Sequence, residues 1–363
     1  MQKPFPFSGF SGSYAAEDVH FLLRPIEITM TPVTVKEQLI QSGASHYSDM
    51  LSYESAPTAR HSHLFNQALK QGAPRLAQEV LRLAQTLAAQ QTDTALVLIS
   101  LVRAGVPLGV MLQQALRDMG KDSYHYGISI IRDRGIDTTA LDWIESKHGT
   151  EGIVFVDGWT GKGAISHELS KALNGRKGYP EQPKLVVLAD PCGYAWLSAS
   201  HDDWLIPFGI MGAPVSGLIS RSVWSEKGLH GCMLCEHLQE HDCSQHLVDT
   251  VAAYRHKLMT AATPTPLLTT GYSTARQQRS RDLITNLVNT YHIDSINRIK
   301  PGIAEATRAV LRRVPEHVLV RNCNDLDVAL LIYLAKEIGI PIKEVGEKTG
   351  PYHAITIIKK VSV

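Results

Sequence analysis

Residues 153–164 read IVFVDGWTGKGA, and this stretch decides the fold of the chain around it. Its first four residues are apolar and predict a buried strand, and Asp157 follows at the end of that strand. A loop with three glycines then leads into a helix that begins near Ala164. Such a loop directs free backbone N–H groups and the positive end of a helix at the space above the strand. We therefore expect a phosphate group to bind there.

A nucleotide-binding P-loop does not fit this stretch. That motif requires G-x-x-x-x-G-K-[ST]. Here Gly158 lies only three residues before Gly161, and Gly163 stands where Ser or Thr would bind magnesium. The phosphate must therefore be held by a loop of another type.

The strand, the acid, the Thr-Gly turn and the helix resemble the ribose-5-phosphate loop of type I phosphoribosyltransferases. The resemblance implies that Asp157 binds the ribose hydroxyl groups and that residues 160–163 cradle the 5′-phosphate. The sequence departs from the family in two ways. Gly158 stands where a second acid is usual, and the loop is about one residue short.

A second strand-loop-helix unit lies upstream. Residues 95–99 are apolar and predict a buried strand, which runs into SLVRAGVPLG at residues 100–109. Pro107 suits the first turn of a helix. Arg103 and Gly105 would then lie at the end of the strand, where α/β folds bind ligands. The Arg-Ala-Gly-Val-Pro run resembles the pyrophosphate-binding loop of the same transferase family.

The two loops together predict a reaction. The resemblance implies that the protein binds phosphoribosyl pyrophosphate with Mg²⁺ and that a nucleobase-like acceptor displaces the pyrophosphate. The predicted catalytic residues are Asp157, which would orient the ribose, and Arg103, which would offset the charge of the departing pyrophosphate. The residues predicted to bind phosphoribosyl pyrophosphate are Ala104, Gly105, Gly158, Thr160, Gly161, Lys162 and Gly163.

The rest of the first half continues the alternation of strands and helices. Apolar spacing over residues 74–90 predicts an amphipathic helix. Further strands are predicted at residues 126–131, 184–190 and 204–208. This order indicates an α/β fold with a doubly wound parallel sheet, as in type I phosphoribosyltransferases.

Charge is unevenly distributed although the whole chain carries only +1. Residues 275–363 contain 14 Lys and Arg against 9 Asp and Glu, whereas the remainder contains 22 against 26. A basic C-terminal part on an acidic body indicates a nucleic-acid partner at that end. The 363 residues allow two or three domains.

The cysteine count and the hydropathy pattern predict a compartment. Five cysteines are an odd number, and the first residues carry no long apolar core, so we expect a reducing, cytoplasmic environment. No run approaches the roughly 18 apolar residues of a membrane span, so no membrane partner is expected. A homodimer is compatible with the sequence.

A cluster of cysteine and histidine residues follows. Cys232-x₂-Cys235-x₇-Cys243-x₂-His246 forms two chelating pairs that would suit tetrahedral zinc, although the spacer is shorter than in common zinc fingers. The alternative is a helix over residues 234–254 with partly buried thiols and solvated imidazoles. The sequence favours the helix and leaves zinc as a second interpretation.

A third interpretation is a nucleophilic cysteine. Chains of this type resemble the StiP family, some members of which are described as cysteine proteases. No pattern around Cys192, Cys232 or Cys235 resembles a known protease signature. Protease activity is therefore the least favoured of the three interpretations of these cysteines.

A Pro- and Thr-rich stretch divides the chain. It predicts a first domain over residues 1–262, a linker over residues 263–274 and a second domain over residues 275–363. The second domain is predicted to alternate helices and strands. Its residues 299–310 read IKPGIAEATRAV.

This second motif resembles the PELOTA and kink-turn-binding ribosomal protein family. The resemblance implies an α/β domain in which a helix N-terminus contacts RNA. The residues predicted to bind RNA are Lys300, Gly302, Glu305 and Arg308. Ala304 stands where the base-reading Asn is usual, which argues against sequence-specific kink-turn binding.

The combination of the two domains resembles the proteins encoded in tellurite-resistance stress clusters. The main expectation is a phosphoribosyltransferase coupled to an RNA-binding module in a stress response. Because the second acid is absent from the ribose loop, a non-catalytic sensor of nucleotide and RNA is the first alternative. The cysteine protease is the second alternative.

Overall fold

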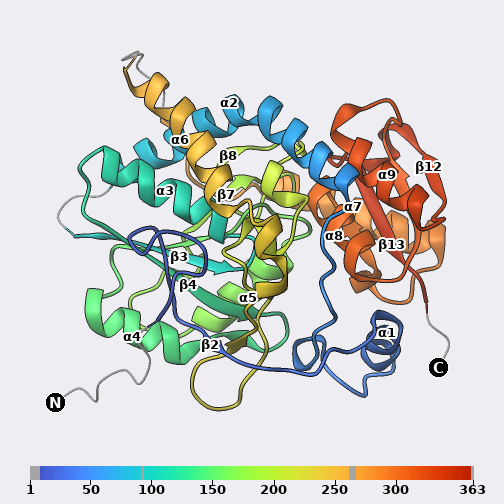
Figure 1. Ribbon diagram of the computed structural model, residues 1–363, viewed down its shortest axis with the longest axis horizontal. Coiled ribbons are helices and arrows are strands. Elements are labelled where there is room, and N and C mark those ends of the chain that lie inside the picture. Colours follow the sequence, from blue (N-terminus) through green and yellow to red (C-terminus); the bar gives the residue numbers. More distant parts are fainter. Residues whose placement is uncertain (1–8, 91–93, 261–266, 361–363) are drawn as a thin grey trace.

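The computed structural model describes residues 9–90, 94–260 and 267–360, which form two α/β modules packed side by side (Figure 1). The N-terminal module contains a sheet with strand order β1-β4-β3-β6-β7-β8, in which β5 pairs with β4. The pairs along this order are parallel, and the β4–β5 pair is antiparallel. The α/β class with a parallel sheet, predicted from the sequence, is confirmed. The strands are β1 (His20–Phe21), β3 (Leu96–Val102), β4 (Ser123–Ile131), β5 (Gly135–Ile136), β6 (Ile153–Val156), β7 (Leu185–Ala189) and β8 (Leu197–Ser200).

Helices cover both faces of this sheet. On β3, Leu96 and Leu98 belong to one core and Val97 and Ile99 to the other, as the two-residue period of a strand requires. The helices α2, α3 and α6 contribute to the first core, and α4 and α5 contribute to the second. Their bounds are α2 (Ala59–Gln90), α3 (Val106–Asp118), α4 (Thr138–His148), α5 (Ala164–Leu173) and α6 (Ser244–Thr260).

The C-terminal module has its own four-stranded sheet, with strand order β10-β13-β11-β12. One face packs on α7, whose Leu283 and Leu287 share a core with Ile355 of β13. The other face packs on α8 and α9. The elements are α7 (Thr274–Tyr291), β10 (Ile299–Pro301), α8 (Ile303–Arg312), β11 (Pro315–Val320), α9 (Ala329–Glu337), β12 (Ile342–Glu344) and β13 (Ala354–Ile358).

Short segments connect these layers. The helix α1 (Val33–Gln41) lies below the C-terminal module in Figure 1, and β2 (Arg24–Pro25) pairs with β9 (Gly231–Cys232). None of the helices in the described ranges has the length and apolarity of a membrane span. The 3₁₀ helices are η1 (Tyr47–Asp49), η2 (Pro207–Gly209), η3 (Ala213–Val215), η4 (Glu236–His241), η5 (Ile296–Arg298), η6 (Leu326–Val328) and η7 (Gly346–Thr349).

Three predicted segments differ in the structure. Residues 204–208 form no strand, because Pro207 lacks an N–H group and begins the 3₁₀ helix η2, and β8 is the edge strand instead. The helix predicted over residues 234–254 is divided where the Asp242 side chain accepts a hydrogen bond from the backbone N–H of Ser244 (2.9 Å) and starts α6 there. The amphipathic helix predicted from residue 74 begins fifteen residues earlier, at Ala59.

The predicted linker over residues 263–274 lies partly outside the described residues, at 263–266. The described part of the linker is hydrogen-bonded to the N-terminal module. The Leu268 N–H donates to the Thr86 hydroxyl (3.0 Å), and the Gly271 N–H donates to the carbonyl oxygen of Trp196 (2.7 Å). From residue 274 the same stretch is already part of α7.

One carboxylate connects the modules at the start of α8. Asp203 of the N-terminal module is 8% exposed. It accepts hydrogen bonds from the backbone N–H groups of Ile303 (2.9 Å) and His353 (2.7 Å) in the C-terminal module. The Tyr352 hydroxyl also crosses the boundary and donates to the carbonyl oxygen of Gly161 (2.5 Å). These contacts fix how the two modules are oriented.

We expect Asp203→Ala to lower the free energy of unfolding by about 2–4 kcal/mol, because two buried N–H groups would lose their acceptor. Asp202→Ala is the matched control, since that neighbouring carboxylate is mostly exposed and pairs only with Arg75 among the described residues. Urea unfolding of both variants measures the difference. Equal stabilities would contradict the bridging role of Asp203.

Candidate functional site

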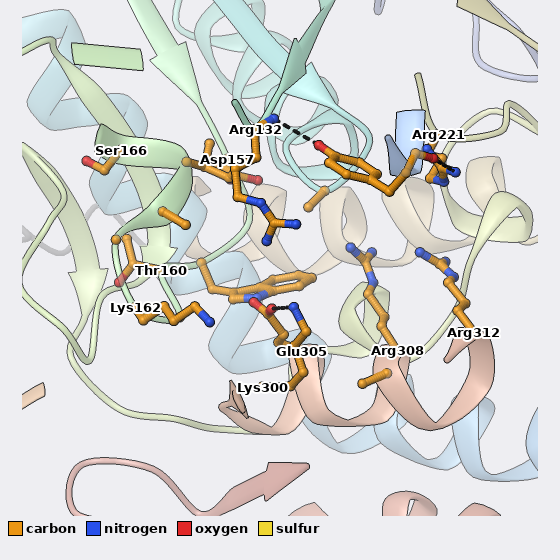
Figure 2. Close-up of a pocket in the computed structure, with 18 of the residues that line it drawn as sticks. Arg132, Asp157, Thr160, Lys162, Ser166, Arg221, Lys300, Glu305, Arg308 and Arg312 are labelled. Atoms are coloured by element: carbon orange, nitrogen blue, oxygen red, sulfur yellow. Dashed lines mark hydrogen bonds and ion pairs between the residues drawn. The ribbon is translucent and has the colours of Figure 1, made fainter. Parts of the chain in front are cut away.

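A cavity of about 340 Å³ lies between the two modules, at the carboxyl ends of the central strands. Its wall combines the loop after β6 with α8 and with segments around α1 and β4 (Figure 2). Eight Lys and Arg side chains line it, against the two acids Asp157 and Glu305. The basic residues are Lys36, Arg132, Lys162, Arg221, Lys300, Arg308, Arg312 and Arg313.

Asp157 lies where the sequence places it, at the end of β6 and in the wall of this cavity. One of its carboxylate oxygens accepts the Gly158 N–H (2.8 Å). Burial raises the pKa of Asp157 to about 7, against the opposing effects of that N–H group and of the Arg308 charge. Asp157 can therefore exchange a proton near neutral pH.

The loop that follows is shaped by its glycines and by its neighbours. Gly163 has a φ of 81° at the start of α5, and a Cβ atom there would lie 2.6 Å from the Tyr194 ring. The Thr160 hydroxyl donates to a carboxylate oxygen of Asp190 (2.5 Å). Lys162 donates to the carbonyl oxygens of Ile296 and Ile299 in the C-terminal module. Both side chains are thus engaged by protein groups.

Three backbone N–H groups of this loop, unlike the two side chains, are not hydrogen-bonded to protein groups within the described ranges. Those of Gly161, Lys162 and Gly163 donate to no protein acceptor within the described ranges. All three residues line the cavity. The arrangement is compatible with the phosphate-cradling role predicted for the loop, which stays a prediction.

The second predicted loop is divided between two cavities. Ala104 lines the cavity beside Asp157, whereas Arg103 lines a second cavity. Arg103 donates to a carboxylate oxygen of Glu54 (3.0 Å) and to the carbonyl oxygen of Ile219 (3.0 Å). Gly105 packs under β6, where a Cβ atom would meet the Val156 carbonyl oxygen at 2.0 Å. The structure therefore does not bring Arg103 and Asp157 together in one cavity.

The predicted RNA-binding residues also lie at the boundary between the modules. Lys300 forms an ion pair with Glu305 (3.4 Å), and the Arg308 guanidinium lies 4.6 Å from the centre of the Trp159 ring. Gly302 precedes α8 and donates its N–H to the Ala354 carbonyl oxygen. The side chains of Lys300, Glu305 and Arg308 point into the cavity shared with Asp157 (Figure 2).

Sequence reasoning missed several of the cavity's basic residues, among them Lys36, Arg221 and Arg312. Arg312 had a signal in the sequence, because it follows Arg308 by four residues and therefore shares a face of α8 with it. Lys36 and Arg221 belong to segments whose position depends on tertiary packing.

A second cavity, of about 410 Å³, lies next to the first and shares Lys36, Arg221 and Arg312 with it. Glu54 lies in its wall. Burial raises the pKa of Glu54, but the Arg103 and Arg312 charges outweigh this effect and bring the value to about 2. Glu54 is therefore ionised and pairs with Arg103 at neutral pH.

Cys235 also lines this second cavity, and it is the cysteine that reaches either of the two within the described part of the chain. Burial raises the pKa of its thiol to about 11, Glu54 adds to the rise, and Arg103 and Arg312 oppose it. Cys192 and Cys232 are buried elsewhere, and burial raises the pKa of each to about 12. No histidine ring within the described ranges is hydrogen-bonded to a cysteine.

The four residues named as zinc ligands do not converge. Cys232 is in β9, Cys235 precedes η4, Cys243 precedes α6 and His246 lies inside α6. Over residues 9–90, 94–260 and 267–360, no group of three or more His, Cys, Asp and Glu side chains is placed to hold a metal ion. The spacing in the sequence therefore does not produce a tetrahedral site.

Comparison with known proteins identifies two family domains in this architecture. The family described as "Tellurite-like stress resistance cysteine protease StiP" matches residues 12–252. The family described as "PELOTA RNA binding domain" matches residues 278–360. The chain belongs to the StiP family and carries a C-terminal PELOTA domain, as the sequence indicated.

A curated relative covers almost the whole chain. The protein named "Cysteine protease StiP" from Acinetobacter baylyi is 50% identical over 367 residues, which cover 97% of this chain and 95% of the relative. The predicted phosphoribosyltransferase activity, with its transferase and magnesium chemistry, is therefore wrong. Family and relative are both described as cysteine proteases, and the stress-response context is confirmed at the level of the family.

Two solved phosphoribosyltransferase structures are only distantly similar. A point mutant of hypoxanthine phosphoribosyltransferase from Trypanosoma cruzi, in complex with the product IMP, is 15% identical with a TM-score of 0.28 and covers 53% of this chain and 92% of its own. A second structure, described as an asparagine mutant of an invariant aspartic acid in HPRTs, has a TM-score of 0.25 and 15% identity over 50% of this chain and 94% of its own. Similarity at this level supports no shared reaction.

The raised pKa of Asp157 predicts a pH-dependent stability. In the unfolded chain Asp157 ionises near its ordinary value of 3.8, whereas in the fold it ionises near 7. Its contribution to stability is thus present below pH 3.8 and is lost as pH rises through 7, by at most about 1.4 kcal/mol per pH unit. Asp157→Asn should therefore gain stability relative to the wild type between about pH 4 and pH 7, and the difference should level off above pH 7.

Urea unfolding at pH 5, 6, 7 and 8 measures this difference. Asp202→Asn, which removes an exposed carboxylate outside the cavity, is the control. If the difference in free energy of unfolding between Asp157→Asn and the wild type stays constant over this pH range, Asp157 does not have a raised pKa in the fold.

Proposed function

We propose that this chain is a thiol-dependent peptidase and that Cys235 supplies the nucleophile. The description of the StiP family and the name of its 50% identical relative support the reaction class. The structural observation that supports the residue is its position: within the described residues, Cys235 is the cysteine that lines either of the two cavities described above. A substrate carbonyl can approach a nucleophile only from such a space.

The surroundings of Cys235 contain groups that favour and groups that oppose a thiolate. Arg103 and Arg312 favour the charged form, whereas burial and Glu54 oppose it more strongly. In the resting protein the thiol is therefore protonated at neutral pH. Catalysis then requires a base that accepts the thiol proton.

His61 is the base that we assign, because it lines the same cavity. Its Nε2 atom is 2.8 Å from the carbonyl oxygen of Ile210, so Nε2 carries the hydrogen and Nδ1 is left as an acceptor. Burial lowers the pKa of His61, so the ring is neutral at pH 7.

The reaction then follows ordinary thiol chemistry. Nδ1 of His61 takes the thiol proton as the sulfur bonds to the peptide carbonyl carbon, and the same proton passes to the leaving amine as the C–N bond breaks. Water then hydrolyses the thioester and restores the thiol. The cavity also has apolar residues at its wall, including the exposed Tyr53 and Ile338, which suits a peptide with large apolar side chains.

Cys235→Ala is expected to lower hydrolysis of fluorescein-labelled casein at least 100-fold, because the nucleophile is removed. Cys232→Ala is the matched control, since it removes an equally buried thiol that lines neither cavity. His61→Gln should also lose activity while keeping a donor for Ile210, whereas His63→Gln, on the exposed side of the same helix, should not. Casein hydrolysis that is unchanged in Cys235→Ala would exclude Cys235 as the nucleophile.

Alkylation of Cys235 by iodoacetamide should accelerate about tenfold for each pH unit between pH 7 and 9. The reason is that the pKa of about 11 leaves the thiolate as a minor species that grows tenfold per unit. Mass spectrometry of the tryptic peptides follows the reaction, and Cys232 should stay unmodified because it is buried outside both cavities. A rate that is independent of pH would mean that the thiolate is already formed.

A further inference from the structure

We infer that the cavity between the two modules binds a small molecule with at least two phosphate groups, held mainly by side-chain cations of α1, α8 and the β4 loop. The excess of eight basic residues over two acids in the cavity wall is the first support. Like charges that are crowded together in a partly buried space repel one another and are costly to desolvate unless an anion accompanies them. A multiply charged anion is the ligand that meets this requirement.

Some of these cations are already neutralised within the protein. Arg313 pairs with Glu37, Lys300 pairs with Glu305, and the Lys162 amine donates to two carbonyl oxygens. These three side chains shape the cavity but have little capacity left for a ligand. They are therefore not the groups on which the inference rests.

Other cations in the wall have unused donors. Lys36 is 6% exposed, and its amine forms no hydrogen bond or ion pair within the described ranges. The Nε atom of Arg308 is buried and likewise lacks a hydrogen-bond partner there, whereas Nε of Arg132 lies 3.4 Å from the Asp133 carboxylate. Arg312 reaches Glu54 only at 4.0 Å. Buried donors are nearly always satisfied in proteins, so this group indicates an anion that accepts from them.

The pKa values of these groups agree with that interpretation. Burial and, to a smaller extent, neighbouring arginine charges lower the pKa of Lys36 to about 8 and that of Arg308 to about 10. A bound anion among them would favour the charged forms. Burial and the Arg103 charge hold the pKa of Arg312 well below its ordinary value, and a bound anion would favour its charged form as well.

The geometry favours phosphate groups on a small molecule. Arg132 from the loop after β4 and the two α8 residues Arg308 and Arg312 point toward one space (Figure 2), and arginine presents a planar set of donors that matches phosphate oxygens. A volume of about 340 Å³ is that of a small-ligand site. The N-terminal module covers α8, and Asp203 already occupies the Ile303 N–H, which leaves little room for an RNA helix at this end.

Inorganic tripolyphosphate is a suitable probe for calorimetry at low ionic strength. Wild-type protein should bind it, and Arg308→Met and Arg312→Met should each weaken binding at least tenfold, because each removes a charged donor while keeping an unbranched side chain. Arg279→Met is the matched control, since Arg279 is exposed on α7 and lines neither cavity. Wild-type affinity in the two α8 variants would overturn the assignment.

Thermal unfolding supplies a second readout that does not depend on peptidase activity. Without ligand, Arg312→Met should unfold at a higher temperature than the wild type, because a poorly compensated buried charge is gone. Tripolyphosphate should raise the unfolding temperature of the wild type and leave that of Arg312→Met unchanged. The opposite pattern, destabilisation of the free variant with an intact response to tripolyphosphate, would contradict the inference.

Two further ligands refine the identity of the anion. ATP that binds more tightly than tripolyphosphate would support a site for a nucleoside phosphate, and equal binding would support a site for the phosphate chain alone. A single-stranded RNA oligonucleotide that displaces tripolyphosphate and binds more tightly would overturn the assignment to a small molecule. All of these measurements use the full-length chain.

Discussion

The carboxylate of Asp203 helps to fix the relative orientation of the two modules, and both cavities depend on that orientation. Asp203 belongs to the stretch between β8 and η2, yet it accepts the N–H groups of Ile303 and His353 in the other module. In doing so it takes the place that an external anion would occupy at the start of α8. The helix is thereby oriented with Glu305, Arg308 and Arg312 facing the loop after β6.

The most predictable features were those that local sequence determines. Residues 153–164 give a strand, a glycine-bearing loop and a helix because the apolar run and the glycines act within a dozen residues. Asp157 accordingly lies in a cavity wall, as expected from its place at the end of a parallel strand. Residues 204–208 looked equally apolar, but Pro207 and the position of β8 decided against a strand.

The candidate site was predictable only in pieces. The sequence predicted one anion site around Lys162 and another around Lys300 and Arg308, in separate domains. The structure places all three in one wall, because the modules dock through contacts that no sequence pattern encodes. The prediction of the reaction was wrong for the same reason: a loop that resembles a ribose-phosphate site carries no information about Cys235, which reaches its cavity from a distant segment. The cysteine spacing also suggested a zinc site, but Cys232, Cys235, Cys243 and His246 lie in or next to β9, η4 and α6 and do not converge.

Helix α1 depends for its support on a part of the chain that is synthesised much later. Its Glu37 is fully buried and pairs with Arg313 of the C-terminal module. Gln41, at the end of α1, donates in addition to the carbonyl oxygen of Lys359 (3.0 Å). A ribosome releases residues 33–41 long before residue 359. Helix α1 therefore lacks these two contacts until the PELOTA domain emerges from the exit tunnel, and the cavities that it lines through Lys36 are completed last.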